Sequence, residues 1–183
     1  DGKRDGYLLP VDVKWNSTTS TLNPATAVAM EDVVKLLKKC EAKHKLLVLD
    51  CCHSGAVFHV TSFGADSTST SVDDENTFSS PAFQIITASR DNQRASDGKY
   101  GHSPFTYGLL QSLNAIPLDN EHYRGKGQRQ FTATKLFSSL ENHLAGQGYQ
   151  NPMCRHVTEA QDQFHFVPAA NAIFGDDDSN VVQ

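Results

Sequence analysis

Residues 50–55 read Asp-Cys-Cys-His-Ser-Gly and place four kinds of reactive side chain within six positions. Cysteine and histidine are metal ligands, paired cysteines carry redox chemistry, and a lone thiolate is a strong nucleophile. The segment directly follows the apolar run 46–49 (Leu-Leu-Val-Leu), so the reactive residues begin where a buried strand would end.

The spacing of these residues disfavours several of the possible chemistries. A zinc site needs about four converging ligands, usually in spaced pairs, whereas Cys51, Cys52 and His53 are consecutive. The chain has no Cys-x-x-Cys redox motif. Phe58 stands where a phosphatase loop needs arginine, and Ser54 lacks the Gly-x-Ser-x-Gly pattern of lipases. Two interpretations remain open: buried structural thiols at a strand end, or a nucleophilic cysteine on a turn.

The elements around this segment are typical of an α/β domain. Apolar residues at helical spacing predict a helix over about residues 26–44, and the apolar run that follows predicts a central strand of a parallel sheet. In open α/β sheets, ligands bind beyond the carboxyl ends of the strands. Alternation places Cys51 and Cys52 on opposite sides, so only one thiol can face such a site. Gly55 then permits a tight turn or a close substrate approach.

Further elements follow toward the C-terminus. Residues 82–89 predict another buried strand and residues 163–168 a last short one. Two helices carry clear start signals: Ser103 is an N-cap with Pro104 after it, and Thr132 caps the second helix, where Phe131 and Leu136 can form a hydrophobic staple.

Four segments of the sequence resemble the caspase–metacaspase superfamily, and its metacaspase branch in particular. The segment 48–55 (Val-Leu-Asp-Cys-Cys-His-Ser-Gly) is similar to the nucleophile motif Asp-x-Cys-His-Ser-Gly. Residues 85–110 resemble the block that follows it in the family, with Asp91 matching and Ser89 standing where the family often has cysteine. The segment 6–12 resembles the stretch shortly after the family's catalytic histidine, and 151–168 its closing strand.

The resemblance implies a fold and a division of the chain. The expected fold is a caspase-like three-layer sandwich, with a mostly parallel central sheet between helices and without the family's first strands. Residues 1–60 correspond to the end of the large-subunit-like region and carry the nucleophile. Residues 61–81 are a polar linker loop, 82–168 the small-subunit-like region, and 169–183 an acidic tail.

The resemblance also implies a cysteine endopeptidase with Cys52 as nucleophile, but the base is not found in its expected place. In caspases the histidine lies about 50 residues before the cysteine. The first histidine here is His44, and none of the eight histidines has a convincing position as base, although His102 lies at a helix start that can approach a cleft. We therefore expect a segment or chain upstream of residue 1 to supply it. The alternative is a catalytically inactive caspase-like module that binds partners.

Asp50, two residues before the nucleophile, predicts the substrate preference. A buried carboxylate needs a cationic partner or hydrogen bonds. It is either a structural group bound by backbone N–H groups or, as the resemblance to metacaspases implies, part of a pocket for Arg or Lys. Ser89 and Asp91, at the end of the next strand, are expected to line the cleft. Caspases that cleave after Asp use arginines instead; the candidates here, outside any such motif, are Arg90, Arg94 and Arg155.

The resemblance implies calcium as a possible cofactor. Asp5, Asp12 and the acidic cluster 73–75 could contribute ligands, but His59 occupies a position where a further acid is expected. This departure argues against calcium dependence, and we assign no metal ligand.

Composition limits the remaining possibilities. The chain has 183 residues and a net charge of −5, which suits one domain and argues against a nucleic-acid surface. It contains no run of eighteen apolar residues, so we expect no membrane partner. Its first residues lack the apolar centre of a signal peptide, and its four cysteines form no disulfide framework. We therefore expect a cytoplasmic protein whose partner is a polypeptide substrate.

Overall fold

A three-stranded sheet lies at the centre of the computed structural model. The structure describes residues 6–61, 81–90, 92, 101–115, 123–124, 128–129, 131–145, 151–157 and 162–166. The strands are β5 (His44–Leu49), β6 (Ala82–Thr87) and β10 (Met153–His156), in the order β10-β6-β5. β5 pairs with β6 in parallel, and β10 pairs with β6 in antiparallel orientation. Within the described residues the sheet is therefore mixed rather than mostly parallel, and β5 lies at its edge rather than at its centre.

The register of the sheet brings distant residues to one edge. Leu49 lies opposite Thr87, and the backbone N–H of Ala88 donates to the carbonyl of Leu49 at 2.9 Å. β5 and β6 therefore end level with each other. The segments that follow them, which begin at Asp50 and Ala88, leave the sheet side by side.

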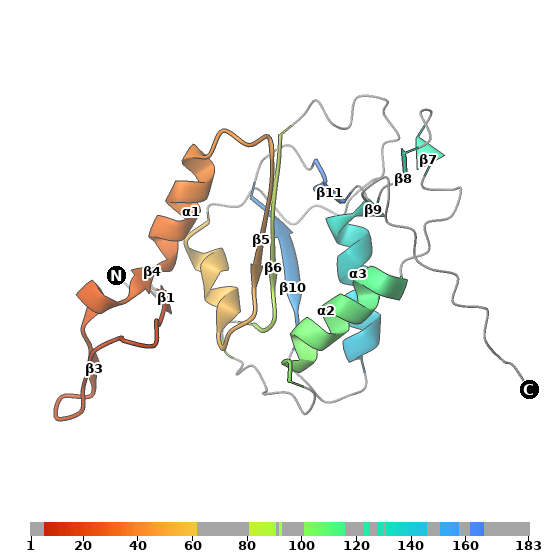
Figure 1. The fold of residues 1–183 in the computed structure, drawn as a ribbon. Coiled ribbons are helices and arrows are strands. Elements are labelled where there is room, and N and C mark those ends of the chain that lie inside the picture. Colours follow the sequence, from red (N-terminus) through yellow and green to blue (C-terminus); the bar gives the residue numbers. More distant parts are fainter. Residues whose placement is uncertain are drawn as a thin grey trace, which may run out of the picture.

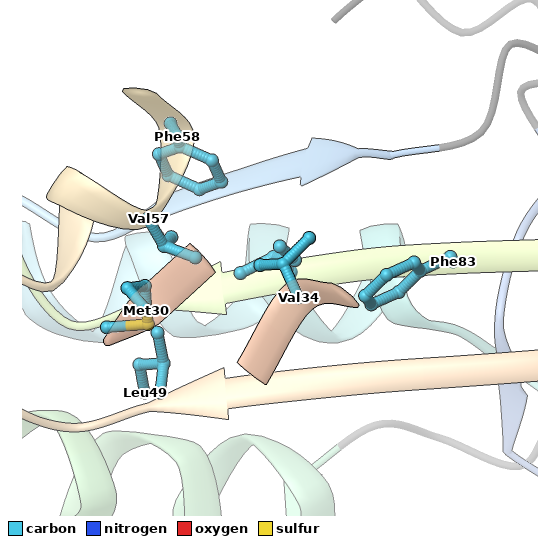
Figure 2. Packing of buried hydrophobic residues seen from close by; sticks show 7 residues of the cluster. Met30, Val34, Leu49, Val57, Phe58 and Phe83 are labelled. Atoms are coloured by element: carbon cyan, nitrogen blue, oxygen red, sulfur yellow. The ribbon is translucent and has the colours of Figure 1, made fainter. Parts of the chain in front are cut away.

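Helices cover both faces of this sheet (Figure 1). On one face, α1 (Met30–Lys39) and the 3-10 helix η2 (Ser54–His59) bury a cluster that Figure 2 shows from close by. Its buried members are Met30, Val34, Leu49, Val57, Phe58, Phe83 and Ile85. On the other face, α2 (Pro104–Ala115) and α3 (Ala133–Leu144) pack against Ile86 of β6. Successive residues of β6 alternate between the two clusters because strand side chains point to opposite faces.

The predicted helix starts of α2 and α3 are confirmed. Ser103 caps α2, where its Oγ accepts from the N–H of Thr106 at 2.9 Å. Thr132 caps α3 in the same way, accepting from the N–H of Lys135 at 3.1 Å. Phe131 and Leu136 pack in one buried cluster, as expected for a hydrophobic staple.

The first helix is shorter than its apolar periodicity indicates. The predicted range 26–44 contains α1 only from residue 30 to residue 39. Before it, η1 (Pro24–Thr26) precedes the short strand β4 (Val28–Ala29), which pairs with β1 (Tyr7–Leu8). After it, His44 already belongs to β5. At both ends of the predicted helix, residues therefore lie in strands that pair with distant segments.

The last predicted strand has a different place from the one expected. Residues 163–168 contain β11 (His165–Phe166), which pairs with β9 (Phe131–Thr132) rather than with the central sheet. The strand that closes the sheet is β10, which lies within the block that resembles the family's closing strand. Two further short pairs, β2 (Trp15–Asn16) with β3 (Thr21–Leu22) and β7 (Tyr123–Arg124) with β8 (Gln128–Arg129), complete the described elements.

Two predicted regions fall almost entirely outside the described residues: the polar loop 61–81, of which only Thr61 and Pro81 are described, and the acidic tail 169–183. Of the helices that are described, none has the length and apolar character needed to span a bilayer.

Candidate active site

The cysteine pair lies on a sharp turn between β5 and η2. His53 follows Cys52 with a φ of 56° in the left-handed region, and η2 begins at the next residue. A left-handed conformation costs a non-glycine residue roughly 1–2 kcal/mol, so the surrounding contacts must hold it. The positive φ thus falls on the histidine, whereas Gly55 is buried inside η2 and its N–H donates to the carbonyl of Ser89 at 2.9 Å.

The two adjacent thiols lie in different environments, as the alternation predicted. Cys51 is half-buried and packs against the hydrophobic cluster beneath η2. Burial raises the pKa of the Cys51 thiol above its ordinary value, and the nearby Asp50 and Cys52 raise it further. Cys52 is exposed. Because the thiolate is the reactive form, the raised pKa makes Cys51 less reactive than an ordinary thiol, whereas Cys52 is open to solvent.

Two buried serines hold the turn against the end of β6. Ser54 and Ser89 are 1% and 0% exposed. The N–H of Ser89 donates to Ser54 Oγ at 3.1 Å, and Ser89 Oγ donates to the carbonyl of Cys51 at 3.3 Å. These bonds join the backbone of the cysteine pair to the neighbouring strand. Ser89 thus lies behind the turn in this structure, and its contact with a substrate stays a prediction.

Asp50 lies at the surface, so the expectation of a buried carboxylate is wrong. Of the two kinds of partner expected, a cation or hydrogen bonds, the structure shows hydrogen bonds: Asp50 accepts from the hydroxyls of Ser103 and Thr106, the latter at 2.5 Å. Both donors lie at the start of α2, whose N-terminal end carries partial positive charge and favours a carboxylate. The N-cap signature identified Ser103 as a helix start, but no local pattern linked it or Thr106 to Asp50.

The remaining predicted site residues are only partly described. Asp91 and Arg94 lie outside the described residues. Arg155, on β10, places its guanidinium over the ring of Phe58, 5.1 Å from the ring centroid, and Arg90 is exposed. Within the described ranges no group of three or more His, Cys, Asp or Glu side chains converges as a metal site.

Comparison with known proteins identifies the family. An exposed cysteine on the turn after a parallel strand, in a mixed α/β domain, is an arrangement typical of enzymes with a cysteine nucleophile. The model of the family described as caspase domain matches residues 1–164, and the chain belongs to this family. The family consists of cysteine-peptidase-like domains that act on polypeptides. No curated protein matches the chain.

Proposed function

We propose that the protein is a cysteine endopeptidase of the metacaspase branch that uses Cys52 as nucleophile and cleaves after Arg or Lys. The observation that carries the proposal is the contrast between neighbouring thiols. Cys51 is half-buried with a raised pKa, and Cys52 is exposed on a turn held by Ser54 and Ser89. A chain that needed only two structural thiols would have no reason to hold one of them outward at the carboxyl edge of its sheet.

In the proposed reaction the Cys52 thiolate attacks the carbonyl carbon of the scissile peptide bond. A histidine takes the thiol proton and later transfers it to the leaving amine. The electron pair displaced onto the carbonyl oxygen is stabilised by backbone N–H groups, for which the N–H of Cys52 is our candidate. Water then hydrolyses the acyl-enzyme and restores the thiol.

We propose that a segment preceding residue 1 supplies this histidine. The sequence contains no histidine before His44. In the described part of the chain, β5 pairs only through its β6 side, and Val48 on β5 is 38% exposed although its side chain is apolar. An upstream strand beside β5 would cover this edge and extend the sheet into the complete caspase-like three-layer sandwich.

The proposed preference for basic residues rests on Asp50. Its carboxylate is exposed, lies two positions before Cys52, and attracts a substrate cation rather than an aspartate. Arg155, one of the cations that could have favoured acidic substrates, lies over Phe58. This distribution of charge supports cleavage after Arg or Lys.

The test is peptide hydrolysis by the protein expressed with its native preceding sequence. Matched fluorogenic peptides carry Arg, Lys or Asp before the cleaved bond, and Cys52→Ala is compared with Cys51→Ala. We expect cleavage of the Arg and Lys peptides, complete loss in Cys52→Ala and retention of most activity in Cys51→Ala. Absence of activity on every peptide would favour the inactive binding module, and a preference for Asp would refute the assigned specificity.

A further inference from the structure

The hydrogen bonds of Asp50 are distributed unequally between its two carboxylate oxygens. The hydroxyls of Ser103 and Thr106 both donate to Oδ2. No described residue donates to Oδ1. Each carboxylate oxygen accepts about two hydrogen bonds, so the two hydroxyls saturate Oδ2, whereas Oδ1 keeps its accepting capacity with respect to the described residues.

The two donor hydroxyls have little freedom to move. Ser103 Oγ accepts the N–H of Thr106 as the N-cap of α2, so its hydrogen is directed away from the helix and toward Asp50. The helix is itself fixed against α3, because Phe105 is fully buried in the cluster between them and Gly108 lies so close that a Cβ there would be 3.0 Å from Leu140 Cδ1. The start of α2 is therefore a rigid support for the carboxylate.

We propose that Ser103 and Thr106 are positioning residues for substrate specificity: they hold Oδ2 of Asp50 and thereby present Oδ1 to the cationic group of the substrate. This inference rests on the proposed function, since it requires a substrate with Arg or Lys before the cleaved bond. One available oxygen offers a single-point contact that an ammonium and a guanidinium can both make. The arrangement thus explains how one carboxylate can serve both basic side chains.

The experiment compares Arg with citrulline in otherwise identical peptides, because citrulline has nearly the shape of Arg but no charge. Thr106→Val removes the hydroxyl and keeps the branched shape, and Thr106→Ser restores the hydroxyl. Ser103→Gly removes the other donor but retains a residue that is accepted at the N-cap. We expect Thr106→Val and Ser103→Gly to lower kcat/KM for the Arg peptide about tenfold, with less than about a twofold change for citrulline, and Thr106→Ser to recover most of the loss.

Thr134→Val is the matched control. Thr134 also lies in the first turn of a helix, and its hydroxyl donates to Gln163 Oε1 at 2.6 Å. Loss of this hydrogen bond should lower the stability of the protein without changing the ratio of Arg to citrulline cleavage. If Thr106→Val lowers kcat/KM equally for the Arg and citrulline peptides, or for neither, while the parent protein still prefers Arg, the positioning role alone is wrong. If the parent protein shows no preference for Arg over citrulline, the proposed specificity fails and the positioning role fails with it.

Discussion

Ser54 and Ser89 are separated by 35 positions in the sequence and joined by a hydrogen bond of 3.1 Å between the N–H of Ser89 and Ser54 Oγ. Both side chains are almost completely buried. Because Ser89 also donates to the carbonyl of Cys51, this pair links the end of β6 to both sides of the exposed Cys52. We infer that the turn carrying Cys52 derives its shape from β6 as much as from its own sequence.

Replacing Ser89 should therefore destabilise the turn. Ser89→Ala removes the hydroxyl that donates to the carbonyl of Cys51, and leaving that carbonyl without this partner costs about 1–3 kcal/mol. The free energy of unfolding in urea measures this loss. Ser112→Ala is the control, because Ser112 is also buried but its Oγ has no hydrogen-bond partner among the described residues. That change should be nearly neutral, and equal losses in the two variants would contradict the role of Ser89.

The four thiols should react with iodoacetamide in an order set by exposure. Cys52 and Cys40 are exposed and should be modified first at neutral pH. Burial raises the pKa of Cys51, so its modification should be slower and should accelerate as the pH is raised. Burial, helped by Glu141, raises the pKa of Cys154 to about 12, so Cys154 should react last in the folded protein. Peptide mass spectrometry gives the order, and modification of Cys51 before Cys52 would overturn it.

Acid should destabilise the protein through His156. The N–H of Phe164 donates to Gln84 Oε1, which turns the Gln84 amide nitrogen toward His156 Nε2, at 3.3 Å. This ring nitrogen can accept a hydrogen bond only when it carries no proton. Burial lowers the pKa of His156 below its ordinary value of 6.5, an effect that Asp162 opposes. The unfolded state therefore binds the proton more tightly, and stability is lost as the pH falls through and below this value.

The variant His156→Gln removes this titration but keeps a hydrogen-bonding side chain. Between about pH 7.5 and about pH 5.5, the range in which histidine titrates, the urea midpoint should fall less in His156→Gln than in the parent protein. His59→Gln, at an exposed position, is the control, and its urea midpoint should fall as much as that of the parent protein. A fall of the same size in all three proteins would show that His156 contributes nothing to the acid sensitivity.

Self-cleavage should spare the polar region between the nucleophile and β6. The sequence from Cys51 to Ser89 contains no Lys or Arg, so an enzyme with a basic preference has no site there. We expect cuts after basic residues elsewhere: Lys3, Arg4, Arg124, Lys126 or Arg129. Sequencing the new N-termini after incubation tests this expectation, with Cys52→Ala as the inactive control. Termini that follow Asp66, Asp73 or Asp74 only in the active protein would contradict the basic preference.

Local sequence patterns predicted the parts of the fold that depend on near neighbours. The N-caps Ser103 and Thr132 each bond to a backbone N–H three residues later, so a short window contains the whole interaction. The different exposure of Cys51 and Cys52 was expected from alternation along an extended chain, and it is observed although both residues lie on the turn after β5. The two N-cap predictions are confirmed because their physical cause lies within one helical turn.

The features that the sequence did not predict depend on residues far apart in the chain. Asp50 bonds to Thr106 across 56 positions, and the exposure of Asp50 depends on where α2 packs. The antiparallel pairing of β10 with β6 and the position of β5 at the edge of the described sheet are also set by long-range contacts. Hydrophobic periodicity shows that a strand exists but not which strand it joins, so these relationships required the structure.

The central claim is that Cys52 attacks substrates whose cationic side chain is bound by Asp50. The most direct measurement is covalent labelling of the protein, carrying its native preceding sequence, by peptide chloromethyl ketones that end in Arg or in Asp. We predict that the Arg reagent labels Cys52 faster than the Asp reagent, as read by peptide mass spectrometry, and that Asp50→Asn removes this preference. Labelling of Cys51 in place of Cys52, or faster labelling by the Asp reagent, would contradict the account.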